Sequence, residues 1–214
     1  RGQRQEGWKC GSVAGTAFAN QPTFGDNPRA RNAPVLAGLF GSNVQGNWFV
    51  GTYENRPSEA APVGDQTDLP TGILESASFT LAVGAQFELS VGGGFHAWNP
   101  AWDPDNMPAP DGAGATTVNL ERQVGPNDWE VIFSEAGRGD EIMHFARWDA
   151  SAYAGDTVRL RVYDNNTGGW GHINVDNIQY FAAIPEPSSV MLVGAGALAL
   201  AGFAARRRKS AAAE

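Results

Sequence analysis

The stretch TVRLRVYD, residues 157–164, predicts the fold class of this chain. Apolar and basic side chains alternate along it, with Val158, Leu160 and Val162 on one side and Arg159 and Arg161 on the other. Successive side chains of a β-strand point to opposite faces of a sheet, so a period of two is typical of a half-buried strand. We expect the aliphatic side chains to point into a core and the two arginines to face solvent.

The same alternation recurs in short segments that are separated by Gly, Pro, Asn and Asp. Further strands are expected over residues 47–53, 72–81, 86–91, 116–122, 129–134, 142–149 and 173–181. The 27 Gly and 13 Pro indicate many turns, and no segment of this region has a convincing amphipathic helical pattern. These features predict an all-β fold, an antiparallel β-sandwich whose sheets are apolar on the inner face and polar outside.

Charge and cysteine content exclude some classes of function. The chain carries a net charge of −8, and residues 206–209 supply four of its 15 basic residues. The remaining 11 face 21 acidic residues once Glu186 and Glu214 are left aside, a balance of about −10 that argues against nucleic acid as a partner. Cys10 is the only cysteine, so no internal disulfide can form. No apolar stretch follows Arg1, so we expect that an export signal was removed or that the sequence is a fragment.

The C-terminal region has the order of a membrane-inserted segment. Residues 188–205 contain no charge, and they are followed at once by the basic residues Arg206, Arg207, Arg208 and Lys209. Eighteen helical residues reach roughly 27 Å, about the thickness of a bilayer core. We expect a single apolar transmembrane helix here, with its basic end in the cytoplasm and the body outside. The alternative, a buried core helix of a soluble domain, would show a polar face, and this segment has none.

Pro185, Glu186 and Pro187 stand just before that apolar run. The order Pro-Glu-Pro, short apolar helix and Arg-rich end resembles the PEP-CTERM sorting signal. The resemblance implies an exosortase partner that cleaves near the motif, and export across the inner membrane of a Gram-negative bacterium. It also implies transient membrane insertion, followed by release to the cell surface or the extracellular matrix. We therefore expect a body over residues 1–183 and a removable signal over 184–210.

The body carries a second resemblance, over GTYENRP (51–57), PTGILESASFTL (70–81), FELSVGGG (87–94) and residues 147–178, of which GGWGHINVDNI is the most distinctive part. It resembles the non-catalytic β-sandwich module found beside levanase- and invertase-type glycoside hydrolases, which is similar to galactose-binding-like jelly rolls. The resemblance implies a jelly-roll sandwich without catalytic residues. In addition, no GxSxG motif surrounds a serine. We expect the protein not to be an enzyme.

Candidate carbohydrate ligands are the aromatic side chains of two loops. Trp98 and Trp102 lie with His96, Asp103 and Asp105 in a long loop, and Trp170 and His172 lie in the glycine-rich stretch before the last strand. Sugars present apolar C–H faces as well as hydroxyls, so exposed aromatic rings beside fixed polar groups suit them. The alternative is structural: the loop tryptophans cover the end of a sheet, Trp170 caps the core and His172 hydrogen-bonds a loop.

Three acidic residues are candidate metal ligands. Glu54, Asp164 and Asp176 could bind Ca²⁺ together with backbone carbonyls, because this hard cation takes several oxygen ligands. A structural Ca²⁺ is also implied by the galactose-binding-like resemblance, and no other cofactor is expected. The simpler alternative for Asp164 is that it begins an Asp-Asn turn.

The expected function is that of an exosortase-sorted surface or matrix protein with a non-catalytic β-sandwich, near or bound to extracellular polysaccharide. Two alternatives stay open. The chain could be the accessory domain of a secreted glycoside hydrolase whose catalytic part is missing, or a structural matrix component without a ligand.

Overall fold

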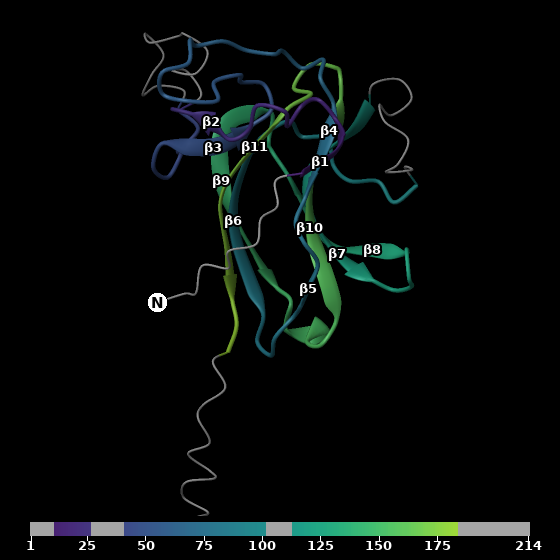
Figure 1. The fold of residues 1–214 in the computed structure, drawn as a ribbon. Coiled ribbons are helices and arrows are strands. Elements are labelled where there is room, and N and C mark those ends of the chain that lie inside the picture. The colour runs from purple at the N-terminus through teal and green to yellow at the C-terminus, as the bar shows by residue number, and fades with distance from the viewer. Residues whose placement is uncertain (1–10, 27–40, 102–112, 184–214) are drawn as a thin grey trace, which may run out of the picture. The chain divides into compact units, whose positions relative to one another are not determined.

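The computed structural model describes residues 11–26, 41–101 and 113–183, which form two antiparallel sheets (Figure 1). One sheet has the order β1-β4-β10-β7-β8, with β5 also paired to β10, and the other has the order β2-β3-β11-β6-β9. The strands are β1 (Gly11–Gly15), β2 (Thr23–Phe24), β3 (Trp48–Gly51), β4 (Gly72–Glu75), β5 (Phe79–Thr80), β6 (Gln86–Gly93), β7 (Ala113–Gln123), β8 (Trp129–Ala136), β9 (Asp140–Asp149), β10 (Thr157–Asn166) and β11 (Ile173–Phe181). A 3₁₀ turn, η2 (Ser151–Tyr153), precedes β10. The all-β, antiparallel prediction is confirmed; the jelly-roll connectivity stays a prediction.

One expected strand is divided. Residues 72–81 form β4 and β5 with a break between them, because Ser76 replaces a regular ladder contact. The Leu160 N–H donates to Ser76 Oγ at 2.9 Å, and the Ser76 N–H donates to the Leu160 carbonyl at 2.9 Å. A side-chain oxygen thus takes the place of a backbone acceptor, and the strand resumes only at β5.

The core lies between the sheets and is built from the inward positions of their central strands. The fully or nearly fully buried aliphatic and aromatic side chains there include Phe87, Leu89 and Val91 of β6, Val118 and Leu120 of β7, and Val158, Leu160 and Val162 of β10. Burying each such side chain contributes roughly 1.5–3 kcal/mol before the entropic cost of folding. The inward assignment of the β10 and β6 positions is confirmed.

The outward face of β10 differs from the expectation in one respect. Arg159 and Arg161 point away from the core, but Arg161 is only 8% exposed. A second small cluster covers this face, where Ile73, Ala115 and Tyr163 are buried and Trp98 packs against them. The prediction that both arginines face solvent is therefore wrong. Trp98 and Tyr163 cover the outer face of this sheet near Arg161, and the Arg159 side chain, which lies against the Trp129 ring, is itself only 12% exposed.

The expected C-terminal helix, residues 188–205, and the signal over 184–210 lie outside the described residues. Within residues 11–26, 41–101 and 113–183, no helix is long and apolar enough to cross a bilayer. By its backbone contacts the chain divides into two compact units, Arg1–Ala182 and Ala183–Glu214.

Candidate ligand-binding site

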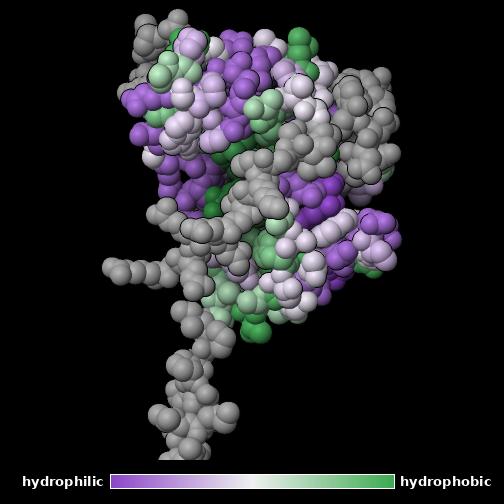
Figure 2. Space-filling view, viewed as in Figure 1, coloured by the Kyte–Doolittle hydropathy of each residue, from purple (hydrophilic) through white to green (hydrophobic). Residues whose placement is uncertain are grey.

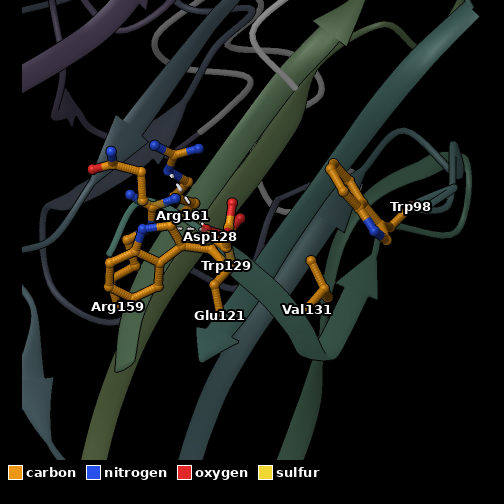
Figure 3. A pocket seen from close by; sticks show the side chains of 8 residues that line it. Trp98, Glu121, Asp128, Trp129, Val131, Arg159 and Arg161 are labelled. Carbon is orange, nitrogen blue, oxygen red and sulfur yellow. Dashed lines mark hydrogen bonds and ion pairs between the residues drawn. The ribbon is translucent and has the colours of Figure 1, made fainter. Parts of the chain in front are cut away.

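A cavity of about 400 Å³ opens on the outer face of the six-stranded sheet (Figure 3). Strands β7, β8 and β10, the turn between β7 and β8, and the loop after β6 supply its walls. The lining side chains are Trp98, Glu121, Asn127, Asp128, Trp129, Val131, Arg159 and Arg161. Because aromatic and charged side chains converge on it, this cavity is the candidate ligand-binding site.

The floor of the cavity is a network of two arginines and two glutamates. Arg159 Nε lies 2.8 Å from Glu121 Oε2, and Arg159 Nη1 lies 3.0 Å from Glu75 Oε2. Arg161 Nε donates to the same Glu75 oxygen at 2.5 Å. The side chain of Glu121 is only 3% exposed, so removing one partner would leave a buried charge, which typically costs about 3–5 kcal/mol. The network therefore fixes the floor in one arrangement.

Tyr163, which is also on β10, adds its hydroxyl group to this network. Its hydroxyl donates to Glu121 Oε1 at 2.6 Å and accepts from Arg161 Nη1 at 3.1 Å. Burial and the neighbouring Glu121 carboxylate raise the pKa of Tyr163 far above its usual value, so the phenol stays neutral. Burial alone would lower the pKa of Arg161, but Tyr163, Glu121 and Glu75 together raise it, so the guanidinium stays charged. The two positive charges of the arginines in the floor therefore balance the two negative charges of Glu75 and Glu121.

Two tryptophans flank the floor. Figure 3 shows Trp98 and Trp129 on either side of Glu121 and Val131. The Trp98 ring packs on Tyr163 with 4.9 Å between ring centroids, and the Arg159 guanidinium lies 3.9 Å from the Trp129 ring centroid. Contact with the guanidinium holds Trp129 in place by a cation–π interaction. Trp98, a predicted ligand, therefore lines the cavity beside a second tryptophan.

Sequence reasoning missed Trp129 because it opens an alternating segment and was assigned only to a strand. Its position directly after the turn residues Pro126–Asp128 is the signal that could have marked it as a rim residue. Glu121, Arg159 and Arg161 were also missed as site residues. Trp102, Asp103 and Asp105 lie outside the described residues.

Trp170 and His172 lie at another place, the loop end of the sandwich. Trp170 is 36% exposed and its ring packs at 5.5 Å from the His172 ring. Phe95, 57% exposed, stacks on His96, whose Nε2 lies 3.3 Å from the Gly169 carbonyl. Neither Trp170 nor the Phe95–His96 pair is among the side chains that line the cavity.

His172 is buried between carboxylates. Its Nδ1 lies 2.6 Å from Asp68 Oδ1 and its Nε2 lies 3.3 Å from Glu141 Oε2. Burial alone would lower the pKa of His172, but the hydrogen bonds to Asp68 and Glu141 outweigh it and raise the pKa to about 9. The imidazolium therefore ties the loop before β4 and the start of β9 to the start of β11. This geometry favours the structural alternative for His172, and the ligand role of Trp170 stays a prediction.

The three predicted calcium ligands do not form one group. Asp164 and Glu54 are both buried. Thr52 hydrogen-bonds to Asp164, and the charge of Glu54 contributes to the raised pKa of His172. Asp176 lies on β11, where its carboxylate accepts the Gln45 N–H at 2.6 Å and the Asn177 N–H at 2.7 Å. Within residues 11–26, 41–101 and 113–183 no set of three or more His, Cys, Asp or Glu side chains could hold a metal ion. The calcium site stays a prediction.

The carboxyl group of Asp164 is buried, with one of its oxygens unpaired among the described residues. Its Oδ1 has no hydrogen-bond partner in the described part of the chain, and the residue is 1% exposed. Burial raises the pKa of Asp164 well above its usual value, although Thr52 and the nearby His172 act in the opposite direction. In this environment the protonated form of the carboxyl is favoured.

The described residues define a β-sandwich, and the comparison that bears on export concerns the C-terminal segment. Residues 183–209 match the model of the PEP-CTERM protein-sorting motif, which confirms the prediction made from Pro185–Pro187 and the basic residues 206–209. The motif implies processing by an exosortase and export to the cell envelope or surface.

Among curated proteins, this chain is similar to a putative glycosyl hydrolase of Aspergillus rugulosus, with 27% identity over 150 residues. The match covers 68% of this chain but only 17% of that protein's length.

Similar solved structures include the K1 adhesin domain of Lys-gingipain from Porphyromonas gingivalis W83, with 16% identity and a TM-score of 0.36 over 84% of this chain and 95% of that one. The K2 adhesin domain of Lys-gingipain has 16% identity and a TM-score of 0.33 over 64% of this chain and 73% of that one. A cyclase from Fischerella sp. TAU has 11% identity and a TM-score of 0.31, over 64% and 63% of the two chains.

Proposed function

We propose that this chain is a non-catalytic surface or matrix protein that binds extracellular polysaccharide in the cavity between Trp98 and Trp129. In this proposal, residues 188–205 insert transiently into the inner membrane, an exosortase cleaves near Pro185–Pro187, and the body is released to the cell surface. The sorting motif supports the first part. The observation that carries the second is that two tryptophans flank a fixed floor of charged hydrogen-bonding groups.

The chemistry of the cavity suits a sugar. The rings offer apolar faces to the C–H groups of a pyranose, while Asn127, Asp128 and the arginines offer donors and acceptors to its hydroxyls. Because the ion pairs of the floor already hold Glu121 and Arg161 in place, a ligand need not order these side chains when it binds, which lowers the entropic cost of binding.

The charge of the cavity limits the class of sugar. The two arginines are balanced by Glu75 and Glu121, and Asp128 adds one negative charge at the rim. The body as a whole is also acidic. Uncharged or amino-bearing glycans are therefore favoured over uronic-acid polymers, which would meet like charge.

The test is calorimetry of the full chain and of residues 1–183 against a panel of neutral, amino-bearing and uronic-acid glycans. Trp129→Ala and Trp98→Ala should each weaken binding about tenfold to a hundredfold, the equivalent of losing one buried aromatic contact. Trp48→Ala is the matched control, because Trp48 is 41% exposed on β3 of the other sheet. Binding to no glycan would contradict the proposal and leave the structural matrix role, and stronger binding of uronic-acid polymers would contradict the charge argument.

A second candidate function is that of an accessory domain of a secreted glycoside hydrolase. The similarity to part of a putative glycosyl hydrolase supports it. Release of reducing sugars from the glycan panel by the full chain would contradict the non-catalytic role. The coding sequence upstream of Arg1 would show whether a catalytic domain accompanies this one.

A further inference from the structure

One end of the sandwich, which we call the exit pole, is formed by the turn 82–85, the segment 150–156 and the end of β11 at Phe181. Backbone hydrogen bonds join these parts. The Ala150 N–H donates to the Ala85 carbonyl at 2.9 Å, and the Gly155 N–H donates to the Leu81 carbonyl at 2.8 Å. Phe181 pairs with Gln86 at the start of β6. In Figure 1 the yellow-green end of β11 lies at the lower end of the domain.

The exit pole exposes apolar side chains beside few charges, one of which is the exposed Asp149, paired with Gln86 across the ladder. Val83, at the tip of its turn, is 73% exposed, and Phe181 is 38% exposed. Neither the turn 82–85 nor η2 with the two residues after it contains a charged residue. Asp156, at the edge of the pole, lies 3.4 Å from Arg122. Figure 2 shows hydrophobic residues gathered at this lower end of the domain, although the body as a whole is acidic.

The sequence leaves only a short connection between the end of β11 and the proposed membrane segment, residues 188–205. Three residues, 182–184, separate Phe181 from Pro185, and seven steps along the chain separate Phe181 from Ser188. A fully extended chain spans at most about 3.6 Å per residue, so the end of β11 lies within roughly 25 Å of the first residue of the apolar run. The interfacial layer on each side of the hydrocarbon core is itself about 5–8 Å thick. The domain therefore has little room to move away from the bilayer.

The end of β11 is held in the sheet, so its residues do not unpair and lengthen this connection. Tyr180 accepts a hydrogen bond from the Ala82 N–H at 2.9 Å through its hydroxyl. Its ring packs against Phe79 and Phe87, with centroid distances of 5.7 and 5.1 Å. Releasing β11 would therefore expose a buried aromatic cluster, and the strand stays in the sheet up to Phe181.

We infer that the exit pole is the surface through which the domain contacts the bilayer interface while the sorting segment is in the membrane, with Val83 and Phe181 entering the headgroup layer. The inference rests on the proposed membrane insertion of residues 188–205. Apolar side chains that are buried at the headgroup–acyl boundary strengthen membrane binding in proportion to their buried area. The acidic remainder of the body is repelled by anionic lipids, so the pole, with its apolar side chains and few charges, is the face that approaches them at least cost.

The test is hydrogen exchange, followed by mass spectrometry, of the full chain in nanodiscs of phosphatidylethanolamine and phosphatidylglycerol, compared with residues 1–183 in solution. The turn 82–85 should exchange about tenfold more slowly in the discs, and peptides around Leu69 should not change. Val83→Asp should abolish the slowing, and the milder Val83→Ser should reduce it. Leu69→Asp is the matched control, because Leu69 is 71% exposed but lies in the loop before β4, away from the pole.

Each outcome bears on one step. If the full chain does not co-purify with the discs, the membrane insertion assumed under the proposed function fails. If it does co-purify but the turn 82–85 exchanges as fast as in residues 1–183, the inference about the pole is wrong. Slowing that spreads equally to Leu69 would also overturn it, since the domain would then lie on the bilayer in no preferred orientation. Slowing that needs added exosortase would assign the pole to a protein contact instead.

Discussion

The His172 cluster makes the stability of the body depend on pH in a defined direction. The pKa of His172 is raised from its ordinary value of 6.5 to about 9 in the folded protein. A group whose pKa is raised by folding stabilises the native state fully below its unfolded pKa, and this contribution disappears as the pH rises through the folded pKa. The free energy of unfolding should therefore decline between about pH 6.5 and 9.

The magnitude follows from the size of the shift. Each pKa unit corresponds to about 1.36 kcal/mol, so the raised pKa of His172 stands for about 3 kcal/mol of stability at pH 6 that is lost by pH 10. The side chain is 4% exposed and its partners Asp68 and Glu141 are 23% and 14% exposed, so solvent screens the cluster little. A loss of this size is a large part of the stability of an ordinary domain.

The assay is urea unfolding of residues 1–183 between pH 6 and 10, followed by tryptophan fluorescence. His172→Gln should lower the free energy of unfolding by about 3 kcal/mol at pH 6 and by much less near pH 10. Asp68→Asn removes the closest carboxylate and should flatten the same pH range. Asp149→Asn is the matched control: Asp149 is exposed, and hydrogen bonds from Ser151 lower its pKa, so it is ionised throughout this range.

The reasoning would be refuted by a wild-type unfolding free energy that stays constant from pH 6.5 to 9. It would equally be refuted if His172→Gln kept the full wild-type slope, because the slope would then belong to another group.

Two further predictions concern the neighbouring carboxyl and the metal. Asp164→Asn should raise the free energy of unfolding at pH 8 by on the order of 1 kcal/mol and change it little at pH 4, because the amide mimics the protonated carboxyl that burial favours. The measurement is urea unfolding at both pH values. A loss of stability at pH 8 would show that the native state uses the charged form of Asp164. For the calcium prediction, excess Ca²⁺ should raise the melting temperature of the full chain and EDTA should lower it, since a ligand that binds only the native state stabilises it. Asp164→Asn and Glu54→Gln should remove the difference in melting temperature between the two additions. A wild-type melting temperature that neither addition changes would contradict the prediction.

The strands and the core could be predicted from the sequence where the alternation of apolar and polar residues within one segment was sufficient to identify them. In β10 and β6 the alternation of apolar and polar residues identified the inward positions, since those side chains meet the opposite sheet whatever its exact register. The division of residues 72–81 into two strands was missed, because it depends on a hydrogen bond between Ser76 and Leu160, 84 positions further along the chain.

The candidate site was predicted much less completely, for a related reason. Trp98 could be proposed from loop composition, but the burial of Arg161 depends on Glu75 of β4 and Glu121 of β7, its partners across two strand pairs. Likewise, His172 was singled out by its glycine-rich neighbours, yet its role follows from Asp68 and Glu141, which lie 104 and 31 positions away. Pairings at such separations carry no local signal.

The clamp of His172 between Asp68 and Glu141 has a consequence for how this protein can mature. It joins three distant segments without a covalent bond, in a chain whose single cysteine rules out an internal disulfide. Assembly of these contacts therefore requires no oxidant and no thiol exchange. The body can reach its native state under reducing or oxidising conditions alike, and its folding does not have to wait for the oxidative enzymes that many exported proteins need.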